Sequence, residues 1–524
     1  MIIGIDTGGT NVDGVLLDET GICGTAKVPN TQTRESIVAV VRALEDSCGV
    51  LTVERVVVAT TLVVNAAVQD RLPPATNLLI PGPGLAPERS FFGQENLIAD
   101  GAVDHRGRIT EPLAIDETGR HDVRAITAKF SDRNPDLERE LAELCEADST
   151  LALGNESGPG LTFPERAKTT VANARAKPVF EAYERAVEQA IADAGLDAPV
   201  YYLKGDGAML GSTAMETTPA HTIRSGSAAS ALGLVALTGL DSGVAVDIGG
   251  TTTDVTSITD QFPDTEPDVA ESGLETAYEG VTARSLPIGG DTIIVSESGI
   301  SLGDERIGDA VALGGDRPTL TDALHVLGIF EVGDVEAARS SLSALGGDPE
   351  VIASSVVDEF ETRVTDAIAT IADSTSISIA VGGTLAPILG PRLREAGDAI
   401  EHVDVPGYAD VAGAVGCGVA RVSVDTAVHI DSQRGTKTVT AVGSERVDTV
   451  ERGKRFSARE VREIAAQAAQ EAAISAGGEP NKPVEIMATD GFSVVERGSV
   501  VGQIIDARAR VTPGIERWFV GDSP

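Results

Sequence analysis

The stretch DTGGTNVD at residues 6–13 returns later in the chain as DIGGTTTD at residues 247–254. Each copy follows a short apolar run, IIGI in the first case and VAV in the second, and each leads into a further β-rich segment. Short apolar runs on either side of a glycine-rich turn predict two strands joined as a hairpin. Because an internal repeat marks related structural units, we expect two related lobes that each open with the same hairpin.

The tip of such a hairpin is suited to binding phosphate. Gly8 and Gly9 let backbone N–H groups approach phosphate oxygens with no Cβ in the way, and the Thr10 hydroxyl adds a donor. Asp6 stands at the strand end, where a carboxylate can hold Mg²⁺ directly or through water. Two tips facing each other across a cleft would grip a polyphosphate from both sides, as phosphoryl transfer requires.

The two commonest nucleotide-binding motifs do not account for these tips. The chain contains no G-x-x-x-x-G-K-[ST] stretch, and no G-x-G-x-x-G opens a helix after a first strand. The paired hairpins resemble those of the actin, heat-shock ATPase and sugar-kinase superfamily. That resemblance implies an α/β fold with two actin-like (ribonuclease H-like) ATPase lobes around a nucleotide cleft. It also implies a later glycine pair against the adenosine, and Gly382 and Gly383 follow a predicted strand at 377–380.

The rest of the chain fits this organisation. Predicted strands at 200–203, 244–248 and 377–381 each precede a glycine turn, which is typical of α/β proteins with parallel sheets. The longest helical stretch, 163–194, contains Pro178, so we expect two helices or a kink there. After about residue 425 the pattern changes to short strands and one helix. We therefore expect lobes at 1–178 and 179–425, and a small C-terminal α+β unit at 426–524.

Further segments carry a closer resemblance. They are ATTLVVNA at 59–66, FPERAKTTVANA at 163–174, KGDGAM at 204–209, TIRSGSAA at 222–229, PTLTDA at 318–323 and YADVAGA at 408–414. Their order resembles that of the A-type subunits of the hydantoinase/oxoprolinase family, over residues 1 to about 420. The resemblance implies a subunit that uses ATP to phosphorylate the carbonyl oxygen of a cyclic amide or imide, such as a hydantoin or 5-oxoproline. It further implies an oligomer and a companion B-type subunit that helps to complete the hydrolysis.

The same resemblance implies roles for individual residues. Asp6 and Asp247 would hold Mg²⁺, and the ATP phosphates would be cradled by Gly8, Gly9, Thr10, Asn11, Gly249, Gly250, Thr251 and Thr252. Thr60, Thr61 and Asn65 would face the substrate, although Thr60 or Thr61 could instead cap a helix. Asp13 and Asp254 either take part in catalysis or brace their own hairpins.

The strongly acidic composition of the chain excludes two classes of binding partner. The chain has 524 residues, 80 Asp and Glu against 41 Lys and Arg, and a net charge of −39. Such a field repels nucleic acid and anionic membranes, so we expect neither as a partner. Dispersed acid, scarce Lys and 3% aromatic residues are typical of a halophilic protein adapted to high intracellular salt.

The cysteines and the hydropathy indicate the compartment. Four scattered cysteines with no C-x-x-C spacing indicate buried free thiols in a reducing environment. No apolar run approaches the ~20 residues that span a bilayer, so we expect a cytoplasmic protein.

Two other functions stay open at this point. An ATP-driven chaperone that reactivates a partner enzyme, or a small-molecule kinase, would use the same architecture. The ordered family segments favour the ATP-dependent hydrolase subunit.

Overall fold

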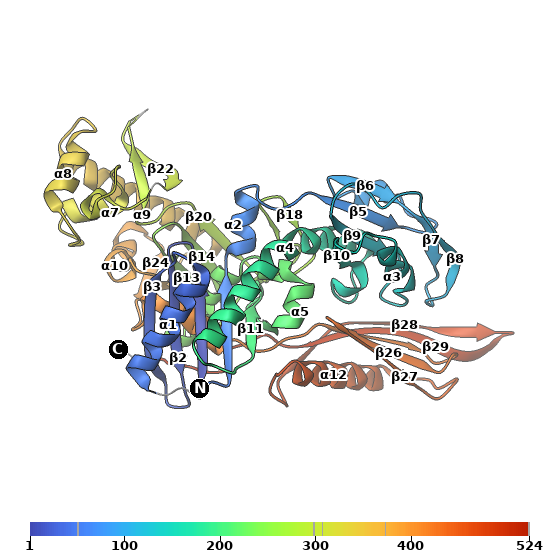
Figure 1. Cartoon of the computed structure of the whole chain (residues 1–524). Helices are drawn as coiled ribbons and strands as arrows, with labels where there is room; N and C mark the ends of the chain where they lie inside the picture. The colour runs from blue at the N-terminus through green and yellow to red at the C-terminus, as the bar shows by residue number, and fades with distance from the viewer. Residues whose placement is uncertain (50–51, 297–298, 307, 373, 522–524) are drawn as a thin grey trace.

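Both repeats form the predicted hairpins in the computed structural model, which describes residues 1–49, 52–296, 299–306, 308–372 and 374–521 (Figure 1). In the first, β1 (Ile2–Thr7) pairs antiparallel with β2 (Asn11–Leu17), and Asp6 stands opposite Asp13. In the second, β13 (Gly243–Ile248) pairs antiparallel with β14 (Thr253–Thr259), and Asp247 stands opposite Asp254. The two tips therefore share strand register as well as sequence.

The sheet of the first lobe has six strands in the order β12-β11-β4-β1-β2-β3, in which β11 spans Val200–Leu203 and β12 spans Met209–Gly211. β1 lies between its antiparallel neighbour β2 and its parallel neighbour β4 (Arg55–Thr60), and β3 (Ile22–Pro29) forms the edge. Helix α1 (Thr33–Cys48) covers this sheet with Ile37, Val40, Val41 and Leu44, as its helical spacing of apolar residues predicts.

The second lobe repeats this plan. Its sheet runs from β15 (Phe262–Pro263) through β14 and β13 to β23 (Ile377–Gly382) and β24 (Ile400–Asp404). β13 lies between antiparallel β14 and parallel β23. β20 (Ala283–Leu286) pairs with β14, and α9 (Pro349–Ala372) and α10 (Ala386–Ala396) belong to the core of this lobe. Since each hairpin strand has the same antiparallel and parallel neighbours, the expected α/β fold with two related lobes is confirmed.

The two lobes are joined by a close crossing of α6 (Ser225–Thr238) and α11 (Ala412–Val419). A Cβ on Gly233 would lie 1.8 Å from the Ala412 carbonyl oxygen, and one on Gly416 would lie 1.8 Å from the Ala229 carbonyl oxygen. The helix backbones therefore touch directly, because glycine leaves no side chain between them.

The predicted division at residue 178 is wrong. Helix α4 (Phe163–Asp193) runs unbroken through Pro178, and β11 (Val200–Leu203) and β12 (Met209–Gly211) then complete the first sheet. Proline removes one helical hydrogen bond, but burial of Phe180 and Tyr183 just beyond it holds the helix in place. The first lobe thus draws on residues well past 178.

Between β4 and α4 the chain forms a separate four-stranded parallel sheet. Its strands are β6 (Glu95–Ile98), β5 (Ala75–Ile80), β9 (Val123–Ala128) and β10 (Thr150–Leu153). The hairpin of β7 (Asp100–Val103) and β8 (Ile109–Ala114) extends from it. Figure 1 shows this unit beside the C-terminal one, away from the two lobes.

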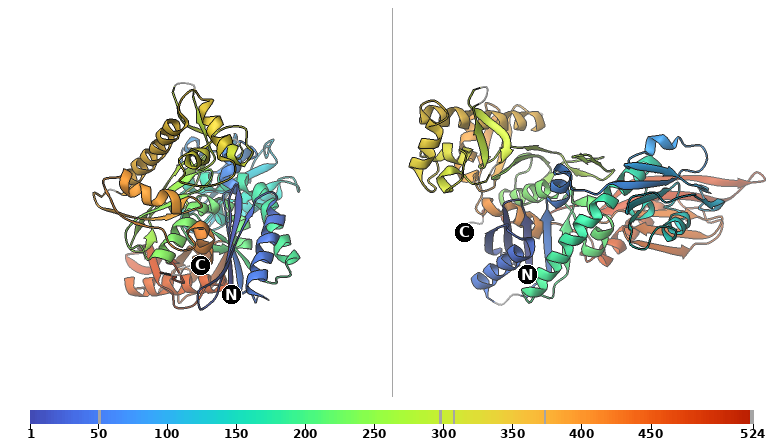
Figure 2. Two further views of the ribbon diagram at one scale, coloured as in Figure 1. Left: turned by 90° about the vertical axis from the view of Figure 1, so that its left-hand side faces the viewer. Right: turned by 45° about the horizontal axis from the view of Figure 1, so that its top comes forward.

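The C-terminal unit is a five-stranded antiparallel sheet in the order β27-β26-β25-β29-β28, with one helix, α12 (Ala458–Ser475), against it. The strands are β25 (Thr426–Asp431), β26 (Thr436–Ala441), β27 (Ser444–Thr449), β28 (Val484–Glu496) and β29 (Ser499–Val511). The long β28–β29 hairpin projects beyond the rest of the molecule (Figures 1 and 2). Among the described residues, no helix is both long enough and apolar enough to cross a bilayer.

Candidate functional site

The two hairpin tips meet. Thr10 Oγ1 and Thr251 Oγ1 lie 3.5 Å apart, although 241 residues separate them in the chain. Each tip is a tight turn closed by one backbone bond: the Gly8 N–H donates to the Asn11 carbonyl, and the Gly249 N–H donates to the Thr252 carbonyl, both at 3.0 Å. The tips of the two repeats therefore face each other at close range.

The two hairpins bring four carboxylates and one lysine close to one another: Asp6, Asp13, Asp247, Asp254 and Lys27. Lys27 Nζ donates to Asp13 at 2.8 Å and to the Asp410 carbonyl at 2.8 Å. On the other side, α6 supplies two hydroxyls: Ser227 donates to Asp254 at 3.2 Å, and Ser230 donates to Asp247. The carboxylates of the second hairpin thus accept from hydroxyls of α6, whereas Asp13 of the first hairpin accepts from an ammonium group.

The electrostatics of the cluster disfavour four negative charges. Burial, together with the neighbouring charges of Asp13 and Asp247, raises the pKa of Asp6 to about 8. Burial also raises the pKa of Asp13 to about 6, although Lys27 opposes the rise, and that of Asp254 to about 6. The pKa of Asp247 is raised for the same reason. A cation bound between these four carboxylates would relieve the repulsion between their negative charges.

The donor set fits Mg²⁺ held mainly through water and phosphate. The Oδ1 atoms of Asp13 and Asp254 are buried and have no hydrogen-bond partner among the described residues. Across the part of the chain that the structure describes, no three His, Cys, Asp or Glu side chains are placed to hold one metal ion together. Mg²⁺ keeps several waters and takes one or two carboxylates along with substrate phosphates, so this arrangement suits it.

Glycines let two further segments approach the carboxylates. Gly383 has φ +89°, and a Cβ there would lie 2.5 Å from Asp247 Oδ1. A Cβ on Gly413, in α11, would lie 2.3 Å from Asp6 Oδ2. Gly382 stands opposite Asp247 in the β13–β23 register. The predicted glycine pair therefore lies beside the second tip, and its contact with adenosine stays a prediction.

Sequence reasoning missed a third glycine turn at this site. The Gly290 N–H donates to the Gly249 carbonyl at 3.1 Å, and the Asp291 N–H donates to the Gly250 carbonyl at 2.7 Å. A Cβ on Gly250 would lie 2.7 Å from Asp291 Oδ2. The stretch GGDT at 289–292 resembles GGTT at 249–252 in the second tip, and this similarity is the signal that could have revealed it.

The predicted substrate residues lie at the start of α2 (Leu62–Val68) and contact α6. Ser225 Oγ donates to the Thr60 carbonyl at 2.9 Å, and Thr60 Oγ1 accepts from the Leu62 N–H at 3.2 Å. Asn65 Nδ2 donates to Thr61 Oγ1 at 2.9 Å, and Thr61 makes no capping bond. Thr60 therefore helps to cap the helix, whereas Thr61 and Asn65 form a half-buried polar pair.

Arg224 and His221, which lie just before α6, have structural roles. Arg224, with φ +65°, pairs with Glu266 and donates to the Val281 carbonyl. His221 stacks on Tyr278 with ring centroids 3.5 Å apart.

All four cysteines are free, but only Cys417 is buried, so the expectation of four buried thiols is wrong.

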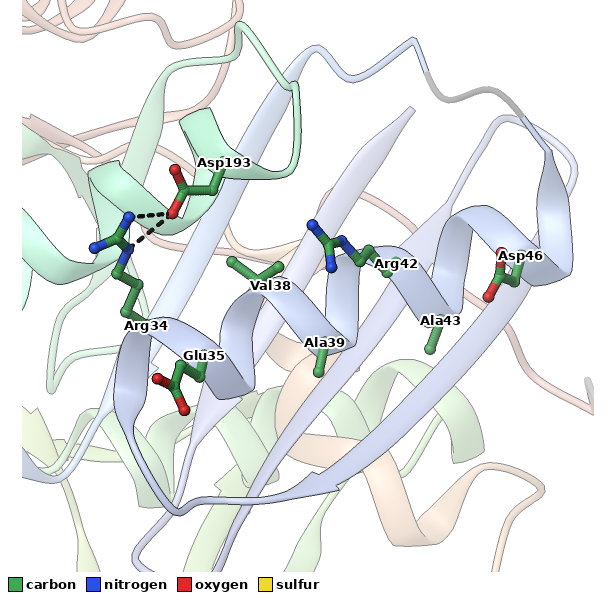
Figure 3. A pocket seen from close by; sticks show the side chains of 8 residues that line it. All are labelled: Arg34, Glu35, Val38, Ala39, Arg42, Ala43, Asp46 and Asp193. Carbon is green, nitrogen blue, oxygen red and sulfur yellow. Dashed lines mark hydrogen bonds and ion pairs between the residues drawn. The ribbon is translucent and has the colours of Figure 1, made fainter.

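A surface hollow lies apart from the cleft, on the outer side of α1 (Figure 3). It is lined by Arg34, Glu35, Val38, Ala39, Arg42, Ala43, Asp46 and Asp193. Arg34 donates to Asp193 at 2.8 Å across it. Because the opposite side of α1 covers the first sheet, this hollow does not open onto the tips.

Comparison with known families matches the chain in two blocks, each holding one tip. Residues 2–91 match the hydantoinase/oxoprolinase N-terminal region, and residues 166–426 match hydantoinase/oxoprolinase. The chain belongs to the hydantoinase/oxoprolinase family. The matching part is of the A type, the ATPase-type subunit, and this confirms the resemblance carried by the ordered segments.

Two curated relatives of this family member are 24% identical to it. One is the caprolactamase alpha subunit of Pseudomonas jessenii, matched over 294 residues that make up 53% of this chain and 41% of the relative. The other is an uncharacterized protein of Methanocaldococcus jannaschii, matched over 509 residues, 82% of this chain and 74% of the relative. The chain thus matches less than half of the curated caprolactamase subunit.

Two solved structures share the fold over nearly the whole chain. Nucleotide-free acetone carboxylase has a TM-score of 0.71 and 17% identity, covering 99% of this chain and 88% of its own. The ATP-dependent caprolactamase of Pseudomonas jessenii has a TM-score of 0.68 and 17% identity, covering 100% and 89%. The C-terminal unit is therefore included in the shared fold.

Proposed function

We propose that this protein is the ATP-using subunit of a hydrolase that opens a cyclic amide or imide of the hydantoin, 5-oxoproline or lactam type. The observation that carries the proposal is the 3.5 Å approach of the two tip threonines. This approach brings the two glycine-rich turns together in a chain of the hydantoinase/oxoprolinase family, and it supports a shared phosphate-binding role for them. The relative named ATP-dependent caprolactamase, whose fold this chain shares, supports the same assignment.

The residues at the tips supply positioning and charge neutralisation. Backbone N–H groups of Gly9 and Gly250 and the hydroxyls of Thr10 and Thr251 would hold phosphate oxygens from both sides. Asp6 and Asp247 would hold Mg²⁺, directly or through water, and bound Mg²⁺ supplies neutralisation of the phosphate charge. An amide resists attack by water because resonance with the nitrogen lowers the electrophilicity of its carbonyl carbon. Phosphorylation of the carbonyl oxygen turns that oxygen into part of a leaving group, phosphate.

Asp13 and Asp254 fit the bracing role better than the catalytic one. Each lies opposite the leading carboxylate of its own hairpin and is held by a neighbour, Lys27 for Asp13 and Ser227 for Asp254. Their buried Oδ1 atoms are left to accept from water around the metal. Thr61 and Asn65, as an accessible polar pair near α6, would meet the ring of the substrate.

The assay that tests the proposal compares three kinds of stimulation with purified protein. ATP turnover that rises with a hydantoin, 5-oxoproline or caprolactam, and yields the ring-opened acid when a B-type subunit is added, is the expected result. Turnover stimulated only by a partner protein would point to a reactivating factor. A stable phosphorylated metabolite would point to a kinase, and turnover that rises only with acetone and bicarbonate would point to a carboxylase.

A further inference from the structure

Charge is distributed unevenly along the chain. Residues 426–524 hold 14 acidic and 13 basic residues, a net charge of −1, so residues 1–425 carry −38 of the total −39. A body of that charge repels an acidic macromolecule from most directions of approach. The C-terminal unit does not, and an acidic partner would meet the least resistance there.

One end of this unit, which we call the distal end, consists of residues 432–435, 450–456 and 490–500. Its three segments are bound to one another: the Gly453 N–H donates to the Ser432 carbonyl at 2.8 Å, and the Val450 N–H donates to the Gly435 carbonyl at 3.0 Å. The Gln433 amide donates to Glu496 near the hairpin tip. The tip of β28–β29 belongs to the distal end and projects into solvent (Figure 2).

The distal end is positive, and three of its four arginines are available; the fourth, Arg434, pairs with Asp431 and donates to the Arg106 carbonyl. It holds five basic residues against three acidic ones, a net charge of +2. Arg452, Arg455 and Arg497 are exposed, and none of them makes an ion pair with any residue that the structure describes. Elsewhere in the same unit Arg446 and Arg459 are paired with glutamates. The free guanidinium groups therefore stand ready for carboxylates from another molecule.

Apolar side chains accompany these arginines. Phe492 is 53% exposed and Val495 is 57% exposed, both on β28. β28 is the last strand of its sheet, so one side of its backbone has no strand partner. Aromatic residues and arginine are the types enriched in protein–protein interfaces, and here both occur on one projecting end.

We propose that the distal end is a docking surface for an acidic protein, the companion B-type subunit; this rests on the proposed function, which requires such a partner. A second copy of this chain is a poorer occupant. In a two-fold contact each patch meets itself, so Arg452, Arg455 and Arg497 would face their own copies. Docking against the acidic body of another copy would be a head-to-tail contact, which gives a ring or an open filament of copies and leaves no site for the companion subunit.

The test uses the full chain and the purified B-type subunit encoded in the same genome, with binding measured by sedimentation velocity at several salt concentrations. The variant is Arg452→Glu, Arg455→Glu, Arg497→Glu. Its matched control is Arg42→Glu, Arg71→Glu, Arg89→Glu, three exposed arginines outside the C-terminal unit. We expect the first variant to weaken binding at least about tenfold and the control to change it less than about twofold. Because all six side chains are exposed, both proteins should keep the melting temperature of the parent.

A single change, Phe492→Ser, should weaken the same complex without altering net charge. Equal binding by the distal variant and the control would overturn the proposal, as would the absence of any complex with the unaltered chain. Self-association that only the distal variant abolishes would assign the surface to a second copy and also overturn it. Lactam-stimulated ATP turnover, measured on the same samples, reports separately on the proposed function: a complex without such turnover leaves the docking surface standing and removes the activity.

Discussion

At the scale of single residues, Asp247 is the carboxylate whose surroundings are best defined, with Ser230 beside it and Gly383 against its oxygen. We expect Asp247→Asn to keep the fold, because an amide oxygen still accepts from Ser230. Loss of the charge should lower lactam-dependent ATP turnover by about 100-fold or more, the size of effect seen when one preorganised polar group is removed. Steady-state kinetics would check this, with the exposed Asp46→Asn as control. Turnover within about threefold of the parent would contradict the role of Asp247.

Glu184 is a second residue with a strong environmental effect, away from the cleft. Burial and the neighbouring Glu216 raise its pKa to about 8, and Ser212 donates to it. The folded state therefore holds a proton that the unfolded chain releases near pH 4.5, so this carboxyl makes unfolding easier as the pH rises from about 4.5 to about 8. Glu184→Gln removes this pH dependence and can still accept from Ser212.

We expect the melting temperature of Glu184→Gln to exceed that of the parent by a margin that grows between pH 5 and pH 9, measured by calorimetry. Parallel curves for the two proteins would show that Glu184 titrates normally.

At the scale of elements, the crossing of α6 and α11 joins the two lobes through touching backbones. Gly233→Ala and Gly416→Ala each place a methyl group 1.8 Å from a carbonyl oxygen of the other helix. Neither helix can yield without moving a lobe, so we expect each change to cost about 1–3 kcal/mol of unfolding free energy. Gly226→Ala in α6 meets only the Thr61 methyl carbon, at 3.2 Å, and should cost less. Denaturant titration ranks the three, and an equal cost for all would contradict the close crossing.

The elements also show how far a sequence can predict this site. The hairpins were predictable because their apolar runs, glycine turns and paired carboxylates are local and occur twice. The contacts of Lys27, Ser227 and Ser230 were not predictable. Each of these residues reaches its aspartate from another segment, and no spacing in the sequence indicates the contact. The boundary at Pro178 failed for a related reason: proline is a local signal to end a helix, whereas the burial that overrides it depends on tertiary packing.

At the scale of the whole molecule, the charge of −38 on residues 1–425 sets the conditions under which the protein is stable. Salt shortens the Debye length from about 10 Å at 0.1 M to about 3 Å at 1 M, and this weakens the repulsion within the folded body. We expect the melting temperature to rise steadily with KCl over this range. A melting temperature that falls or stays level in KCl would remove the argument for adaptation to salt.

The central claim concerns the whole molecule as well, because it requires both lobes to bind one nucleotide. A structure of the protein with Mg²⁺ and a non-hydrolysable ATP analogue tests it most directly. We predict the phosphates between residues 8–10 and 249–251, with Asp6 and Asp247 turned toward the metal. An analogue bound to one hairpin alone, or on another surface such as the hollow over α1, would contradict the account.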